Sequence, residues 1–274
     1  MIEDGKVIEK GTVTDLNIQP QASADFTLPI KTKPKSGKEY FLNISYRFKN
    51  AEPFLEKEYE IANEQMPYAG AAISFDMAAA RGNVKADKQG NKLTLKAGNA
   101  VVEFDTEKGL LTSYKMSGMQ ILENGPAPSF YRAPTDNDIG AGLNKSLREW
   151  RKAYDNNIVE DVKTEQLNAG SYKVSFTKNV LNGKAKTQQS FTIFGDGTIK
   201  VENNFTVDKG DFKSLMRIGN NLQVNKEFTR IQWYGRGPWE NYWDRKYAGE
   251  VACTHVHAKT KRAVFSVRAP AGKR

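Results

Sequence analysis

Short segments in which apolar and polar side chains alternate recur along almost the whole chain. The clearest is 39–48, where apolar residues occupy every second position from Tyr40 to Phe48. Alternation with a period of two is typical of a β-strand with one buried face. Similar runs, separated by turn residues such as Asn182-Gly183 and Asp196-Gly197, predict strands at 93–95, 100–104, 109–114, 172–177, 186–193, 198–207, 215–224 and 229–234. The chain is therefore expected to be all-β.

One segment, 146–156, has a helical pattern instead. Apolar residues recur at three- and four-residue spacing from Leu147, and Ser146 is followed three residues later by Glu149. The first feature predicts an apolar helix face, and the second predicts a capping box at the helix N-terminus. We expect Trp150 to pack into a core.

The pattern divides the chain into four parts. Residues 1–68 are predicted to belong to a β-sandwich, but they are few for an independent one, so we expect further strands before Met1. Small and polar residues predict a linker at 69–91. The size and strand content of 92–250 favour a large two-sheet sandwich, and 251–274 form a separate tail.

Charge and composition narrow the classes of partner. The net charge is +9, but 251–274 hold six Lys and Arg residues and no acid, so most of the excess belongs to the tail. Such a cluster attracts polyanions in general, and we expect no specific nucleic-acid partner. No apolar run approaches the roughly 20 residues of a membrane helix, so no membrane partner is expected either. The start of the chain has no apolar signal core, which leaves the compartment, cytoplasmic or periplasmic, open.

Two stretches rich in Gly and Pro carry the candidate chemistry. The first, 130–140, contains Arg132, Asp136, Asn137 and Asp138. The second, 233–245, contains Arg236, Glu240, Asn241, Asp244 and Arg245, together with Trp239 and Trp243. Guanidinium groups, carboxylates and ring faces build sugar-binding surfaces, and they equally build ion pairs that fix loops. We therefore expect these polar residues at a substrate rim or in structural ion pairs. The two tryptophans could stack on a sugar or fill a core.

The same residues fit other kinds of site less well. Two of the acids could in principle serve a glycosidase, but acids beside arginines are expected to be ion-paired, so we predict no catalytic residue. The Asp136–Asp138 pair lacks the loop of an EF-hand. His255 and His257 could bind a metal from one strand face, but no acid accompanies them and we predict no metal site. The single cysteine, Cys253, excludes an internal disulfide.

The two stretches also resemble a known family. The motif RAPTDNDIG at 132–140, then YGRGP at 234–238, ENY at 240–242 and DRK at 244–246 are similar to the small-chain domain of β-galactosidases of glycoside hydrolase family 2. The motif LMRIG at 215–219 matches that domain as well. Residues 1–68 resemble the preceding domain of these enzymes. The resemblance covers about 1–250.

This resemblance implies a partial immunoglobulin-like β-sandwich followed by a galactose-mutarotase-like supersandwich. It also implies the C-terminal part of an enzyme that hydrolyses terminal non-reducing β-D-galactose residues with retention. Two glutamates, Mg²⁺ and a monovalent cation would act on a (β/α)8 barrel that precedes both domains. On this interpretation the chain holds no catalytic residue and no cofactor. It would meet a β-galactoside only in the intact enzyme, which we expect to be a homo-oligomer.

Two other functions are compatible with the residues. A stand-alone carbohydrate-binding or interface module would use the tryptophans near Glu240 to stack on sugar. A mutarotase-like enzyme is suggested by fold analogy alone, and the scarcity of histidines argues against it.

The tail departs from the family from Val251 onward, because it is basic and holds the only cysteine and both histidines. We expect a frameshifted or truncated reading frame that leaves the second domain C-terminally incomplete. Translating the downstream DNA in the other two frames tests this hypothesis.

Overall fold

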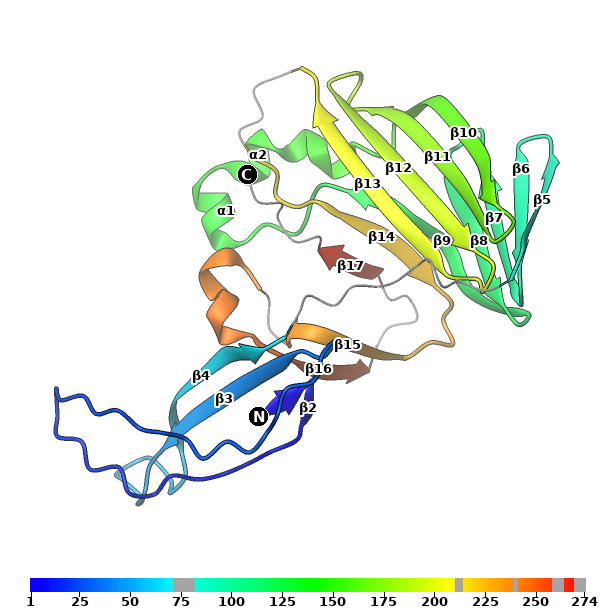
Figure 1. Ribbon diagram of the computed structural model, residues 1–274. Coiled ribbons are helices and arrows are strands. Elements are labelled where there is room, and N and C mark those ends of the chain that lie inside the picture. Colours follow the sequence, from blue (N-terminus) through cyan, green and yellow to red (C-terminus); the bar gives the residue numbers. More distant parts are fainter. Residues whose placement is uncertain (71–81, 210–213, 239–240, 258–263, 269–274) are drawn as a thin grey trace. The chain divides into compact units, whose positions relative to one another are not determined.

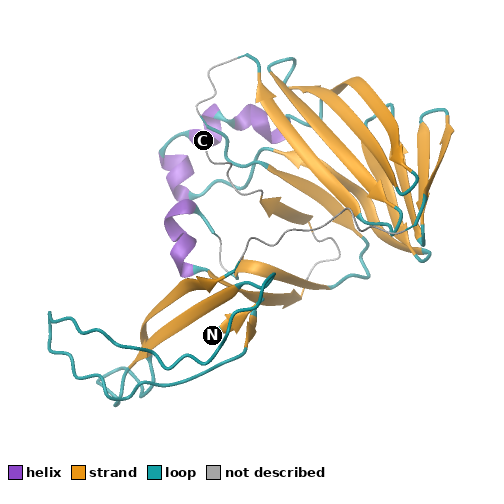
Figure 2. Cartoon of the chain, viewed as in Figure 1, coloured by secondary structure: helices purple, strands orange, loops and turns teal. Residues whose placement is uncertain are grey.

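The structure is a computed structural model that describes residues 1–70, 82–209, 214–238, 241–257 and 264–268 (Figure 1). Antiparallel strands dominate it and helices are few, so the predicted all-β class is confirmed (Figure 2). The chain divides into two compact units. Unit 1 comprises Met1–Asp76 and Arg230–His257, and unit 2 comprises Met77–Thr229 and Ala258–Arg274.

Unit 1 contains a four-stranded sheet and a separate hairpin. The sheet has the order β2-β1-β3-β4, and the hairpin pairs β15 with β16. The strands are β1 (Ile2–Glu3), β2 (Lys6–Val7), β3 (Tyr40–Arg47), β4 (Glu60–Ala69), β15 (Arg230–Gly237) and β16 (Glu250–His257). Strand β3 confirms the strand predicted at 39–48. Strand β4 escaped prediction because its apolar residues do not alternate regularly and Pro67 interrupts them.

Unit 2 is built from two antiparallel sheets that lie face to face (Figure 1). The larger has the order β17-β14-β9-β8-β7-β6-β5, and the smaller has the order β10-β11-β12-β13. Their bounds are β5 (Val84–Gln89), β6 (Lys92–Ala97), β7 (Ala100–Asp105), β8 (Leu110–Met116), β9 (Met119–Ser129), β10 (Ile158–Asn168), β11 (Ser171–Val180), β12 (Ala185–Phe194), β13 (Ile199–Val207), β14 (Gly219–Val224) and β17 (Val264–Arg268).

The core of unit 2 lies between these two sheets. Leu95, Val102 and Phe104 of the larger sheet meet Phe176 and Phe191 of the smaller one, all completely buried. Alternation along each strand places such residues on the inner face, which is the sequence pattern that predicted the strands. Burial of several aromatic rings makes this cluster the main source of stability for unit 2.

Several elements differ from the sequence expectations. Strand β5 lies within the predicted linker 69–91, and β16 lies within the predicted tail 251–274. Residues 230–250 were expected with the second sandwich, yet they belong to unit 1. Strand β14 begins at Gly219 rather than at 215. Strands such as β5 are exposed on most positions, so burial imposes little pattern on their sequence.

The single helix predicted at 146–156 is wrong. The region instead forms α1 (Asp136–Gly140), α2 (Leu143–Ser146) and a 3₁₀ helix, η2 (Arg148–Lys152). Ser146 therefore ends α2 rather than capping a helix. Its hydroxyl donates to the carbonyl of Gly142 at 3.3 Å, an internal bond that competes with the capping role.

The packing role of Trp150 is confirmed. Its side chain is only 1% exposed. The ring makes edge contacts with Phe130 and Phe205, each with centroids 5.6 Å apart. These residues form a second cluster in unit 2, to which Val180 and Ala185 also belong. The helical segment thus closes one end of the smaller sheet.

Candidate functional site

The first arginine-containing loop is fixed by an ion pair within unit 2. Both terminal nitrogens of Arg132 donate to the carboxylate of Asp138, and the Nη2–Oδ1 distance is 3.2 Å. Thr135 completes a capping box at the start of α1. Its backbone N–H donates to Asp138 Oδ2 at 2.8 Å, and its hydroxyl accepts from the backbone N–H of Asp138 at 3.3 Å. The predicted capping box therefore exists, but at Thr135 rather than at Ser146.

These contacts determine the ionisation of Asp138. Arg132, and after it the backbone N–H of Thr135, lower the pKa of the Asp138 carboxyl to about 2. Asp138 is 7% exposed, so its charge is neutralised mainly by these partners. A general acid needs a pKa near the working pH. Asp138 is therefore a structural anion and not a proton donor.

Asp136 and Asn137 lie on the same short helix but are exposed. They are the members of the first stretch whose side chains face solvent. Hydroxyl-rich ligands are recognised by such carboxylate and amide groups. These two residues can meet a ligand, whereas Arg132 and Asp138 hold the loop that presents them.

The second loop joins β15 to β16 within unit 1 and includes the 3₁₀ helix η3 (Trp243–Ala248). Arg236 Nη1 donates to the carbonyls of Lys246 at 2.9 Å and Gly249 at 2.7 Å. The carbonyl of Arg236 in turn accepts from Asn241 Nδ2 at 3.2 Å. A guanidinium that spans several carbonyls stiffens the loop, since each contact is a charge-assisted hydrogen bond. Arg236 is thus a loop-closing residue.

Other predicted members of this stretch lie at or beyond the described part of the chain. Arg245 is exposed. Trp239 and Glu240 lie outside the described residues, as do the side chains of Trp243 and Asp244. The two loops belong to different units, so each was analysed by itself. Their combination into one site stays a prediction.

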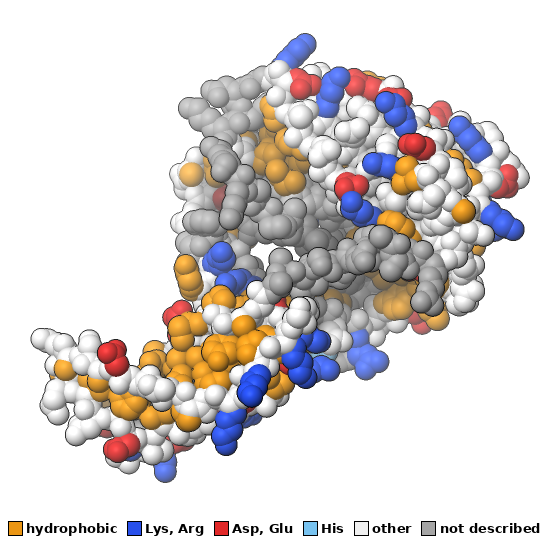
Figure 3. Space-filling view, in the orientation of Figure 1, with side chains coloured by type: hydrophobic (Ala, Val, Ile, Leu, Met, Phe, Trp, Pro, Cys, Tyr) orange, Lys and Arg blue, Asp and Glu red, His pale blue; other side chains and the backbone are white. Residues whose placement is uncertain are grey.

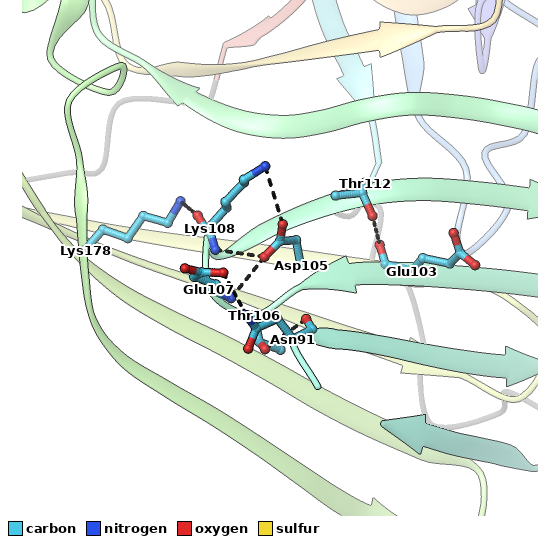
Figure 4. Close-up of polar contacts among 8 residues, drawn as sticks. All are labelled: Asn91, Glu103, Asp105, Thr106, Glu107, Lys108, Thr112 and Lys178. Atoms are coloured by element: carbon cyan, nitrogen blue, oxygen red, sulfur yellow. Dashed lines mark hydrogen bonds and ion pairs between the residues drawn. The ribbon is translucent and has the colours of Figure 1, made fainter. Parts of the chain in front are cut away.

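The sequence reading missed a buried lysine in unit 2 (Figure 4). Lys178 is 1% exposed, and its Nζ donates to the carbonyl of Lys108 and to the hydroxyl of Tyr154, both at 2.8 Å. Burial lowers the pKa of Lys178 to about 8. Burial also raises the pKa of Tyr154. The signal was available, because Lys178 continues the inward-facing positions of Val174 and Phe176.

A second missed feature connects distant parts of unit 1. The side-chain amide of Gln65 on β4 donates to the carbonyl of Val251 at 2.9 Å and accepts from its N–H at 2.6 Å. Asn43 Nδ2 donates to the carboxylate of Glu250 at 2.7 Å. Burial, and to a lesser extent Glu60, raise the pKa of Glu250. Polar residues of the sheet thus hold the β15–β16 hairpin, and no local pattern signals such a contact.

Metal and membrane sites were searched over the described residues. Among them, no group of three or more His, Cys, Asp and Glu residues could hold a metal ion. Cys253 on β16 accepts a hydrogen bond from Gln232 Nε2 at 2.8 Å, and His255 pairs with Gln232 in the ladder. No helix in the described part of the chain is long and apolar enough to span a bilayer.

Comparison with protein families gives matches in chain order. The model described as beta galactosidase small chain matches residues 96–263, and the model described as beta-galactosidase, domain 4 matches residues 1–69. The chain belongs to the β-galactosidase small chain family. The match extends to 263, so the expectation that the likeness ends near 250 is wrong.

Curated relatives agree with this assignment. The β-galactosidase of Priestia megaterium (strain DSM 319 / IMG 1521) is 30% identical over 252 residues, which cover 91% of this chain and 24% of that protein. The Pseudoalteromonas haloplanktis β-galactosidase is 28% identical over 265 residues, covering 90% and 25%. That of Lactobacillus delbrueckii subsp. bulgaricus is 28% identical over 246 residues, covering 89% and 24%. The chain spans about a quarter of the length of these relatives.

Proposed function

We propose that this chain is a non-catalytic part of a β-galactosidase that hydrolyses terminal non-reducing β-D-galactose residues. The observation that carries the proposal is the pair of family matches, at 1–69 and 96–263, in a chain that spans about a quarter of its relatives. The chain would supply scaffold and active-site-rim domains. The catalytic barrel would come from the remainder of the enzyme, together with its Mg²⁺, its monovalent cation and its homo-oligomer contacts.

The chemistry of the first loop supports this division of labour. Retaining hydrolysis of a glycoside needs one protonated acid and one nucleophilic carboxylate about 5 Å apart. Asp138 is committed to Arg132, and a carboxyl with a pKa of about 2 carries no proton to give near neutral pH. The loop is therefore built for rigidity. Exposed Asp136 and Asn137 are its candidates for contacts with sugar hydroxyls.

Activity measurements test the proposal. The purified chain alone should not hydrolyse a chromogenic β-galactoside above the buffer rate. Hydrolysis should appear when it is mixed with a Priestia megaterium β-galactosidase polypeptide that lacks the quarter matched by this chain. Hydrolysis by the chain alone that is lost in Asp136→Asn would contradict the proposal. Millimolar or tighter binding of lactose by the chain alone would instead favour a stand-alone carbohydrate-binding module.

A further inference from the structure

The four-stranded sheet of unit 1 has one polar and one apolar face. Residues directly opposite each other on β3 and β4 share a face. Asn43 lies opposite Gln65, and this polar face holds the β15–β16 hairpin. Leu42 lies opposite Met66 and Tyr46 opposite Ala62, so these residues line the other face. The sheet therefore uses its polar side for packing within unit 1.

The apolar side is left largely open to solvent. Tyr46 is 48% exposed and Met66 is 38% exposed. Figure 3 shows hydrophobic side chains gathered over β3 and β4. An antiparallel sheet with one solvated face normally exposes its polar side and buries its apolar side. The reversed arrangement marks this apolar face as an interaction surface.

A long arm beside the sheet is also incomplete. Residues 10–31 belong to no strand, and Glu9 closes their base by accepting hydrogen bonds from the backbone N–H groups of Lys31 and Thr32 at 2.9 and 2.8 Å. Within the arm, Phe26, Leu28 and Ile30 alternate with other residues as in a strand. Phe26 is nevertheless 48% exposed. The arm thus has the pattern of a strand without a ladder partner.

We propose that the apolar face and the arm together receive extended β-segments of the β-galactosidase polypeptide outside the part matched by this chain. The inference rests on the proposed function. Added strands would pair with the arm through backbone hydrogen bonds, as in β-strand addition. Their apolar side chains would cover Leu42, Tyr46 and Met66. Unit 1 would then become a closed two-sheet sandwich.

The chemistry of the arm favours this occupant over a second copy of the chain. Unpaired backbone N–H and C=O groups require a peptide partner, which neither a lipid nor a sugar supplies in register. Residues 10–38 also contain more lysines than acids, with Lys10, Lys31 and Lys33 near the base of the arm. Two identical arms would bring these like charges together. A different polypeptide segment avoids that repulsion.

Binding and hydrogen exchange test the inference. The probe is the Priestia megaterium β-galactosidase polypeptide without the quarter matched by this chain. A one-to-one complex should form, and amide exchange at 12–18 and 26–30 should slow at least about tenfold, because the new ladder protects those groups. Tyr46→Lys and Phe26→Lys should each weaken binding at least about tenfold. Ile158→Lys, at a 67% exposed position of unit 2, is the matched control and should leave binding unchanged.

The outcomes separate this inference from the proposed function. Restored hydrolysis with unchanged exchange in the arm overturns the inference and leaves the function standing. A stable dimer of the chain alone with a protected arm also overturns it, since a second copy is then the occupant. Equal weakening by Ile158→Lys and Tyr46→Lys does the same. If neither a complex nor hydrolysis is obtained, both proposals fail.

Discussion

Asp138 shows how one side chain can fix a loop and take no part in proton transfer. Asp138→Asn removes the charge that Arg132 and the N–H of Thr135 stabilise. Because the pKa of Asp138 is lowered to about 2, its ion pair is fully formed above the ordinary pKa of 3.8. We expect the substitution to lower the free energy of unfolding by about 2 kcal/mol at pH 7. Urea denaturation measures this value.

The same measurement repeated at lower pH tests the cause. The difference between the natural chain and Asp138→Asn should stay constant down to about pH 4 and shrink as the pH falls toward 2, because Asp138 then becomes protonated. Asp136→Asn, at an exposed position of the same helix, is the matched control and should change stability far less. A difference that does not depend on pH would contradict the ion-pair explanation.

Lys178 is predicted to lower the stability of unit 2 near neutral pH. Its pKa falls from 10.5 to about 8 in the folded chain, so the folded state carries a buried charge below pH 8. Above pH 8 the unfolded state binds more protons, and stability should rise with pH. Between about pH 8 and 9.5 the natural chain should gain about 2 kcal/mol relative to Lys178→Met. Thermal or urea unfolding of both proteins across this range checks it, and parallel pH profiles would refute it.

At the scale of elements, the β15–β16 hairpin is held by a side chain that imitates a strand. The amide of Gln65 makes the two hydrogen bonds with Val251 that a neighbouring backbone would make. Gln65→Leu should leave both groups of Val251 unsatisfied, at a cost of about 1–3 kcal/mol. Hydrogen exchange at 250–253 should accelerate accordingly. Asn63→Leu, on the same face but exposed, serves as the control and should leave this exchange unaltered.

The hairpin also explains which parts of the fold could be predicted from sequence. Strands such as β3 and β12 bury one face, and burial imposes the alternation that reveals them. The Arg132–Asp138 pair was within reach for a similar reason, because its partners lie six residues apart. Gln65 and Val251 are 186 residues apart, so no local pattern records their contact. The exposed strand β5 gives no alternation to detect.

At the scale of the whole molecule, the two units differ in how they depend on the order of the chain. Unit 2 takes most of its residues from one continuous segment, Met77–Thr229. Unit 1 combines the first 76 residues with Arg230–His257, so its sheet and hairpin come from opposite ends of the sequence. Tyr234 donates to Glu39 at 2.6 Å across this separation. Unit 1 therefore cannot complete its packing until residue 257 is present.

Truncation tests this dependence. A chain that ends at residue 229 should keep slow amide exchange in β11 and β12, because their ladders and the aromatic cluster around Phe176 stay intact. It loses β17, but β14 retains its ladder with β9. Amides of β3 and β4 should exchange at least about tenfold faster than in the full chain, since Asn43 and Gln65 lose their partners. A chain ending at residue 257 restores the hairpin and should restore their protection. Equal protection of β3 and β4 in both truncated chains would show that the sheet of unit 1 does not need the hairpin.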